Sequence, residues 1–472
     1  MLAFRRRHHQ EIATGLGGLD ATERRITELY TKAVKQLGSD MAPVRFSGLY
    51  ALERLAQDSP AYRQDIVNVI CAYLRMPFSP TAPARKREPE AAEGQKEPGT
   101  QSGAGPDGIR GTWRQEREVR LTAQGILTEH LRDDRAKDQR STGPPSSRFW
   151  NNIRLDLTGA TLIGFNLVNG VMADANFRGA TFSRDASFNG ATFTGDARFG
   201  GVTFAGAARF GGADFRRGAR FGDATFSRDA RFRRAAFTGD ARFGGATFSR
   251  GASFSGVIFT GAARFGGATF SHGAQFGGAT FTGAAQFGRA AFGGDAGFRR
   301  AAFGGDAGFR EATFGGDAWF YKATFSRGAS LRGTIFTGDA WFGKAAFSRG
   351  ASFDEAAFRG GVWFGETVFS REAWFGEAAF GGDVWFDKAT FSRGASFDEA
   401  VFSGDAGFDK VTFTGGVWFG DATFHGGADA LLFRRARVLS PGAAHVWPTG
   451  WRLAYADGGG YTVVRANDDG GS

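Results

Sequence analysis

The sequence of 472 residues is poor in cysteine, proline, methionine and tyrosine, and it has no long apolar run. The single cysteine, Cys71, rules out an intramolecular disulfide framework and favours a reducing compartment, so we expect a cytoplasmic protein. Because a lone cysteine in an apolar helix is typical of a small core residue, Cys71 is assigned no function. No stretch reaches the roughly 18 apolar residues of a transmembrane helix, which predicts at most indirect contact with a membrane.

Catalytic and cofactor motifs are missing as well. The histidines have no metal-site spacing, and no Walker loop, GxSxG, HExxH or paired-cysteine motif occurs. The glycine-rich GLGGLD at 15–20 follows no predicted strand, so it does not indicate a phosphate-binding loop. The N-terminal MLAFRRRHHQ is basic but is followed by no apolar core, which argues against a secretory signal. We therefore expect no enzyme activity, no catalytic residue, no cofactor and no metal.

Glycine (73 residues) and phenylalanine (51 residues) are present in excess, and such a bias is typical of internal repeats. From Phe182 to Phe424 a large apolar residue recurs at gaps that alternate between six and five residues, and only Leu331 is not phenylalanine. Two residues before each of them stands a small residue, which is alanine in most units. Ahead of this stretch the period is five, at Leu157, Leu162, Leu167, Met172, Phe177 and Phe182.

A period of five matches neither the 3.6 residues of a helical turn nor the two-residue alternation of a strand. It does match a coil with flat sides, in which the phenylalanine and the small residue both point inward. Four sides of five, six, five and six residues give a coil of 22, whereas a coil with three sides cannot repeat, because an odd number of sides breaks the alternation. About twelve such coils at a strand spacing of about 4.8 Å predict a solenoid on the order of 60 Å long.

Units such as ATFTG, ARFGG and ATFSR resemble the pentapeptide-repeat family, in which a central Leu or Phe follows a small and a variable residue. The resemblance covers about 155–427 and departs from the family in the sixth residue of alternate units. It implies a mostly β fold, a right-handed quadrilateral β-helix, which we place at 149–427. The helices ahead of it, and the FW before the first repeat, are also similar to a group of uncharacterised bacterial pentapeptide-repeat proteins.

Outside the repeats, helical spacing of apolar residues predicts a small α-helical module over 19–78, after a basic tail over 1–18. Asp20 and Glu23 resemble a capping box. The segment PVRFSGLYALERLA resembles one helical hairpin of the HEAT or armadillo kind, which must pack on the first helix or on a partner. The remaining segments are predicted as a disordered linker over 79–110, a helix over 111–133 that spans Trp113 to Leu131, a second linker over 134–148, and a C-terminal cap over 428–472 with a hairpin around ADGGG.

If the interior is uniform, function must lie on outward positions, and residues 22 apart should be neighbours on adjacent coils. The residue before the phenylalanine that ends each six-residue gap is expected to point outward. Charge is unequal along the repeats, with 19 basic and 10 acidic residues over 151–310 but 10 basic and 15 acidic residues over 311–427. Two outward stacks are candidate partner-binding residues: Arg198, Arg220, Arg242 and Arg264 on one side, and Trp319, Trp341, Trp363 and Trp385, with Arg209 and Arg231 further down, on the opposite side.

Each stack has two interpretations. The arginines either are solvated side chains balanced by neighbours such as Asp196 and Asp240, or form a strip for phosphates or an acidic protein surface. The tryptophans either stabilise the coils by stacking or mark a contact with a partner or a second copy, because exposed aromatic patches favour association.

The leading hypothesis is a non-enzymatic scaffold that binds a protein partner through a rigid repeat surface. A second hypothesis comes from the resemblance, because some pentapeptide-repeat proteins mimic DNA and bind type II topoisomerases such as gyrase. Those members are acidic along the rod and dimerise through a C-terminal helix, whereas this chain is basic over half of its repeats. A third hypothesis is nonspecific nucleic-acid binding by the basic half, which would depend steeply on salt.

Overall fold

A computed structural model of the chain describes residues 23–80, 106–135, 139, 146–426, 431–456 and 459–466. The chain divides into two compact units, Met1–Ile163 and Gly164–Ser472, and each is described by itself. The expected capping residue Asp20, most of the linker predicted over 79–110 and most of that over 134–148 lie outside the described residues.

The first unit is built from helices. Residues 23–37 are helical, and α2 (Ala42–Asp58), the 3-10 helix η1 (Pro60–Tyr62), α3 (Arg63–Arg75) and α4 (Pro106–Leu131) follow. The apolar faces expected from the spacing are buried on α2 and α3, and Cys71 is 1% exposed. The hairpin packs against the helix over 23–37 at Gly48, where a Cβ atom would lie 2.8 Å from the carbonyl oxygen of Ala33.

Helix α4 begins earlier than the expected start at Trp113. Its first residue is Pro106, which lies within the linker predicted over 79–110. The physical reason is that proline is tolerated in the first turn of a helix, where its missing N–H costs no internal hydrogen bond. A proline in a polar segment can therefore open a helix as well as break one.

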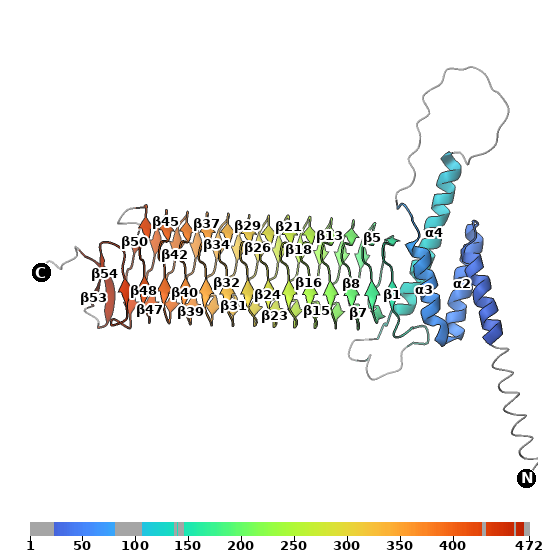
Figure 1. Cartoon of the computed structure of the whole chain (residues 1–472), viewed down its shortest axis with the longest axis horizontal. Coiled ribbons are helices and arrows are strands. Elements are labelled where there is room, and N and C mark those ends of the chain that lie inside the picture. Colours follow the sequence, from blue (N-terminus) through green and yellow to red (C-terminus); the bar gives the residue numbers. More distant parts are fainter. Residues whose placement is uncertain are drawn as a thin grey trace, which may run out of the picture. The chain divides into compact units, whose positions relative to one another are not determined.

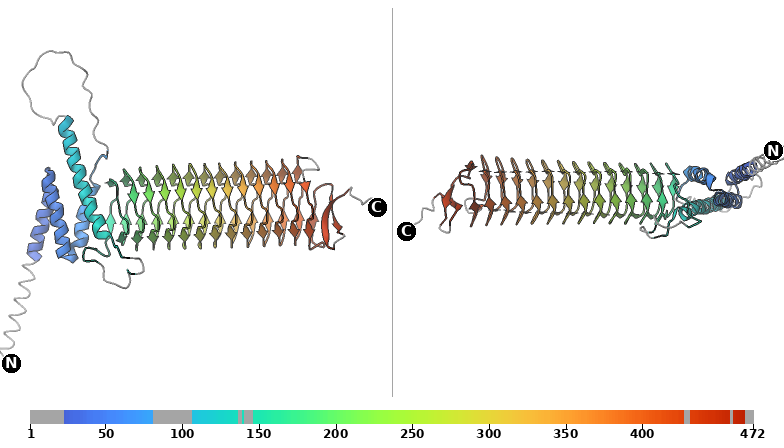
Figure 2. Two further views of the ribbon diagram at one scale, coloured as in Figure 1. Left: turned by 180° about the vertical axis from the view of Figure 1, so that it is seen from behind. Right: turned by 90° about the horizontal axis from the view of Figure 1, so that it is seen from below.

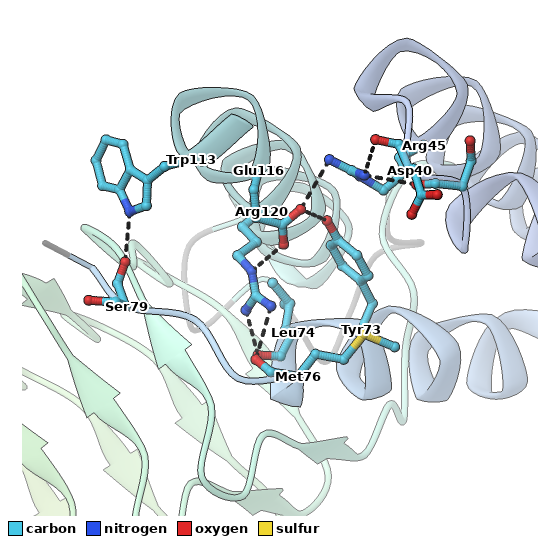
Figure 3. A network of polar contacts seen from close by, with 10 residues as sticks. Asp40, Arg45, Tyr73, Leu74, Met76, Ser79, Trp113, Glu116 and Arg120 are labelled. Carbon is cyan, nitrogen blue, oxygen red and sulfur yellow. Dashed lines mark hydrogen bonds and ion pairs between the residues drawn. The ribbon is translucent and has the colours of Figure 1, made fainter. Parts of the chain in front are cut away.

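A buried charge network ties α4 to the end of α3 (Figure 3). Arg120 is only 2% exposed and donates to the backbone oxygens of Leu74 and Met76 at 3.1 and 2.9 Å, and to the Glu116 carboxylate at 2.6 Å. These carbonyls lie at the C-terminal end of α3, where no further helical N–H can reach them. The Glu116 carboxylate also accepts from the hydroxyl of Tyr73 at 2.8 Å. Arg120 therefore caps one helix from the next.

The FW dipeptide before the repeats belongs to the same unit. Trp150 is fully buried, stacks on His130 with ring centroids 4.0 Å apart, and donates its indole N–H to Gln57 at 3.0 Å. His130 also contacts Glu53 through Nε2 at 2.8 Å. The first two repeat strands, β1 (Leu155–Asp156) and β2 (Thr161–Leu162), follow directly, and both contact α3.

The second unit is a β-solenoid, and the described residues form about 13 turns of about 22 residues. Each turn has four strands of two residues, as in β8 (Ala197–Arg198), β9 (Thr203–Phe204), β10 (Ala208–Arg209) and β11 (Asp214–Phe215). Figures 1 and 2 show these strands stacked as regular rungs from three directions. The strands of these turns pair in parallel with the strands one turn away, so that Arg198 lies beside Arg220. The coil length expected from the sequence is confirmed.

The strands form four sheets, which we name sides 1 to 4 in chain order. Within this unit side 1 runs from β4 (Ala175–Asn176) to β52 (His445–Val446), and side 2 from β5 (Thr181–Phe182) to β49 (Thr423–Phe424). Side 3 runs from β6 (Ala186–Ser187) to β50 (Leu431–Leu432). Side 4 starts at β3 (Val171–Met172), reaches β51 (Arg437–Val438) and is extended by β54 (Tyr461–Arg465) and β53 (Trp451–Tyr455). Because a coil visits the sides in this order, sides 1 and 3 are opposite faces.

The interior consists of four phenylalanine stacks, one behind each side, and the stack of side 1 is interrupted at Leu331. Phe265 illustrates this packing. Its ring is parallel to the rings of Phe243 and Phe287 on the same side, with centroid distances of 4.8 and 4.9 Å. It contacts the rings of Phe254 and Phe276 on the opposite side edge-on, with centroid distances of 5.3 and 5.4 Å. The repeat phenylalanines from 177 to 413 are all at most 1% exposed. Parallel stacking along each side and edge-to-face contact between sides are both favourable arrangements of aromatic rings.

The regular coil extends past the expected boundary at 427. Phe433 stacks on Phe408 at 4.9 Å although the chain between them is longer than one regular turn, and β50, β51 and β52 pair with strands of the preceding turn. The signal was present in the sequence, because Val438 follows Phe433 at the repeat spacing of five. A hairpin of β53 (Trp451–Tyr455) and β54 (Tyr461–Arg465) then covers this end, and β54 pairs with β51.

Candidate interaction surfaces

The outward residues of sides 1 and 3 form the two stacks expected from the sequence. On side 1 the strand register places the four candidate arginines next to one another: Arg198, Arg220, Arg242 and Arg264. On side 3 it does the same for the four candidate tryptophans: Trp319, Trp341, Trp363 and Trp385. The register thus brings together the members of each stack but holds the two stacks on opposite faces.

The arginine stack is interleaved with carboxylates. Asp196 lies 3.1 and 3.7 Å from the guanidinium groups of Arg198 and Arg220. Asp240 lies 2.6 Å from Arg264 and 3.8 Å from Arg242. The hydrogen bond from Arg264 is the main reason why the pKa of the Asp240 carboxyl is lowered. Four cations therefore share two anions, which leaves this surface less basic than the row of arginines suggests.

The tryptophan stack is not uniform. The indoles of Trp341 and Trp363 are parallel, with ring centroids 3.9 Å apart. The ring of Trp385 lies over the next rung, where a Cβ atom on Gly407 would be 2.3 Å from its Cε3. All four tryptophans are half-buried. Part of their surface therefore stabilises the coils, and part remains open to a partner.

A pocket of about 590 Å³ opens at the N-terminal end of this stack. The Arg299 guanidinium covers the ring of Trp319 at 5.0 Å, a favourable cation–π distance. The indole nitrogen of Trp341 is buried and has no hydrogen-bond partner within the described part of the chain. We call this site the aromatic pocket, and its lining residues are Arg299, Arg300, Trp319, Tyr321 and Trp341.

Sequence reasoning missed three members of the pocket and two more tryptophans. Arg299, Arg300 and Tyr321 lie at the corner after side 3, so reading the sequence at steps of one coil from that offset would have found them. Trp374 and Trp418 continue the arginine stack on side 1, several turns beyond Arg264. Trp374 is 41% exposed, and its ring lies over Gly350.

Two other kinds of site, a metal centre and a membrane-spanning helix, have no candidate among the described residues. Among them, no group of three or more histidine, cysteine, aspartate or glutamate side chains is placed to hold a metal ion. In the same residues, none of the helices combines the length and the apolar character that crossing a membrane requires.

Two comparisons with known proteins gave no match, and one did. Neither the curated proteins nor the solved structures contain a match to this chain. Two family models do match: "Pentapeptide repeats (8 copies)" at residues 156–195, and "Pentapeptide repeats (9 copies)" in overlapping segments that together span 188–429. The matched residues make up more than half of the sequence and coincide with the stacked coils. The chain therefore belongs to the pentapeptide-repeat family.

Proposed function

We propose that this protein is a non-enzymatic interaction scaffold, whose solenoid binds a protein partner at the aromatic pocket on side 3. The pentapeptide-repeat β-solenoid fold is consistent with an interaction scaffold. The observation that carries the proposal is the pocket itself, where two tryptophans, a tyrosine and two arginines line one cavity. These three residue types dominate the energetic centres of protein interfaces.

The chemistry of the pocket favours one kind of contact. The flat indole faces bury apolar or aromatic groups, and the two guanidinium groups attract a carboxylate. A partner segment with an apolar residue beside an acidic one would satisfy both requirements. Because the pocket stands on stacked strands, binding would need little rearrangement of the backbone.

The other hypotheses find less support. Nucleic-acid binding by the arginine stack is weakened by Asp196 and Asp240, which already occupy its guanidinium groups. Gyrase mimicry by the family's acidic members involves a C-terminal helix, whereas residues 451–465 of this chain form a hairpin. No observation favours either hypothesis over a protein scaffold.

The test is affinity capture with the tagged full-length protein in an extract of its source organism, after nuclease treatment. The variant is Trp319→Ser/Trp341→Ser, and Trp374→Ser on the opposite side is the matched control, because it also removes a surface tryptophan. Circular dichroism first establishes that all proteins keep their secondary structure. We expect a protein that is captured by the wild type and by the control but lost with the double variant. Identical sets of captured proteins would refute the pocket as the binding site.

A further inference from the structure

Two opposite edges of the solenoid carry opposite charges. One lies at the corner from side 3 to side 4 and the other at the corner from side 1 to side 2, half a turn away. We call the first the basic edge, with Arg300, Lys322 and Lys344 on three successive turns. We call the second the acidic edge, with Glu355, Glu377, Glu399 and Asp421 on four successive turns. All seven side chains are exposed.

The backbone at these corners makes the charges notable. Every one of the seven residues has a positive φ between 53 and 58°, a region that glycine adopts most readily. Glycine occupies the equivalent corners of many earlier turns, for example at Gly201, Gly212, Gly256 and Gly267. In the later turns the chain thus places charged side chains at corners where glycine would be less strained.

Contacts within the chain leave part of both edges unneutralised. On the acidic edge, Glu355 pairs with Arg332. On the basic edge, Lys344 pairs with Glu366, an acidic residue that occupies the same corner one turn further on and so interrupts this edge. Within the described residues, no ion pair engages Glu377, Glu399 or Asp421 on the acidic edge. The same holds for Arg300 and Lys322 on the basic edge. The basic edge continues at Lys388 and Lys410, but there Asp387 and Asp409 lie beside it in the sequence.

We infer that the acidic edge of one copy docks along the basic edge of a second copy, so that solenoids associate side by side. Charge complementarity and spacing identify this occupant. Both edges repeat once per turn, at the strand spacing of about 4.8 Å, so the unpaired cations Arg300 and Lys322 can face two successive unpaired carboxylates without mismatch. A partner of another fold would need to reproduce this spacing, whereas a second copy has it by construction.

The symmetry of the contact follows from the geometry. The two edges lie at opposite corners, so a copy that uses its basic edge still presents a free acidic edge on the far side. Such a head-to-tail contact is heterologous and does not close into a dimer. We therefore expect assemblies whose average mass keeps rising with concentration above that of a dimer of the 50.5 kDa chain. A discrete dimer over a wide concentration range would contradict this arrangement.

The experiment is sedimentation velocity of the full chain at about 0.01 M and about 0.5 M salt, between which the Debye length falls from about 30 Å to under about 5 Å. We expect association at low salt and monomers at high salt. Lys322→Glu/Lys344→Glu makes both edges acidic, and Glu377→Lys/Glu399→Lys makes both basic, so each variant alone should be monomeric at low salt. An equimolar mixture should associate again, because acidic and basic edges are then present on different molecules.

The matched control is Arg349→Glu/Arg371→Glu, which changes the net charge as much as the lysine variant at exposed arginines on the corner from side 4 to side 1. It should associate like the wild type. A monomeric wild type at low salt, a monomeric control, or a mixture that fails to associate would each overturn the inference. The inference does not rest on the aromatic pocket, and Trp319→Ser/Trp341→Ser separates the two, since it should abolish partner capture without abolishing self-association.

Discussion

Replacing Arg120 by methionine should loosen the helical unit more than any exposed substitution in it. Methionine keeps most of the side-chain volume but leaves the oxygens of Leu74 and Met76 without their donor. It also removes the ion pair with Glu116 at 2.6 Å and the cation–π contact with the ring of Phe78 at 4.8 Å. Breaking a buried ion pair on one side typically costs about 3–5 kcal/mol.

The single cysteine offers a direct assay of this loss. Burial raises the pKa of the Cys71 thiol to about 12, so the folded unit has almost no reactive thiolate at pH 8. A thiol reagent should label Cys71 only when α3 opens, and the labelling rate then follows the population of the open form. A loss of about 3 kcal/mol corresponds to a rate about 100-fold higher, since about 1.4 kcal/mol is one factor of ten.

The control is Arg54→Met, which removes an ion pair with Asp58 in which both side chains are more than two-thirds exposed. Exposed pairs of this kind contribute about 0–1 kcal/mol, so the labelling rate should change less than about fivefold. The reasoning would be refuted if both variants label at similar rates, because the buried network would then contribute no more than a surface pair.

Three further predictions concern the solenoid and the cysteine. Phe265→Ala removes two parallel and two edge-on ring contacts at 4.8 to 5.4 Å, and it should lower the denaturation midpoint by an amount corresponding to about 3–5 kcal/mol. Leu331→Phe should raise the midpoint, because two new stacked ring pairs at about 0.5–1.5 kcal/mol each can form. Burial raises the folded-state pKa of Cys71 above the unfolded value of about 8.5, so the helical unit should lose stability as the pH rises from about 8.5 toward about 12. Urea titrations at pH 7 and pH 10 measure this dependence, and Cys71→Ala should remove it. The hydrogen bond from Arg264 lowers the pKa of Asp240, so the contribution of this carboxylate should be present above about pH 4 and be lost as the pH falls through the lowered folded-state pKa. Both side chains are 40% exposed, so Asp240→Asn should cost less than about 1 kcal/mol at pH 7, and this cost should shrink as the pH falls below about 4.

The repeat pattern made the solenoid predictable in detail. A phenylalanine every five or six residues admits one register only, because a slip of one residue would turn the ring from the core to solvent. The coil length and the neighbours of Arg198 and Trp319 therefore followed from counting. The predicted end of the solenoid at 427 was too early, because the prediction assumed an unbroken spacing of the phenylalanines. Phe433 continues the core after a turn that is longer than the regular one.

The candidate surfaces were only partly predictable. Spacing places Trp319 and Trp341 on adjacent turns, but it does not determine how the indoles lie, which depends on rotamers and on what covers each ring. In the structure Trp341 stacks on Trp363, whereas Trp319 is covered by Arg299. The aromatic pocket results from this difference and has no counterpart in the spacing alone. The charged edges were overlooked for another reason, since the net charge of a segment averages over opposite corners.

The equivalence of the two halves of each turn has a consequence for how such a chain can change. One gap of six and one gap of five between inward phenylalanines make half a turn, and the same pair of gaps then repeats to complete it. Gain or loss of a whole turn lengthens or shortens the solenoid by one rung and leaves each face as it was. Gain or loss of half a turn keeps the core intact but rotates everything beyond it to the opposite face. A duplication of that size would move a surface residue from side 1 to side 3 in a single genetic event, with no change in the residues that hold the fold together.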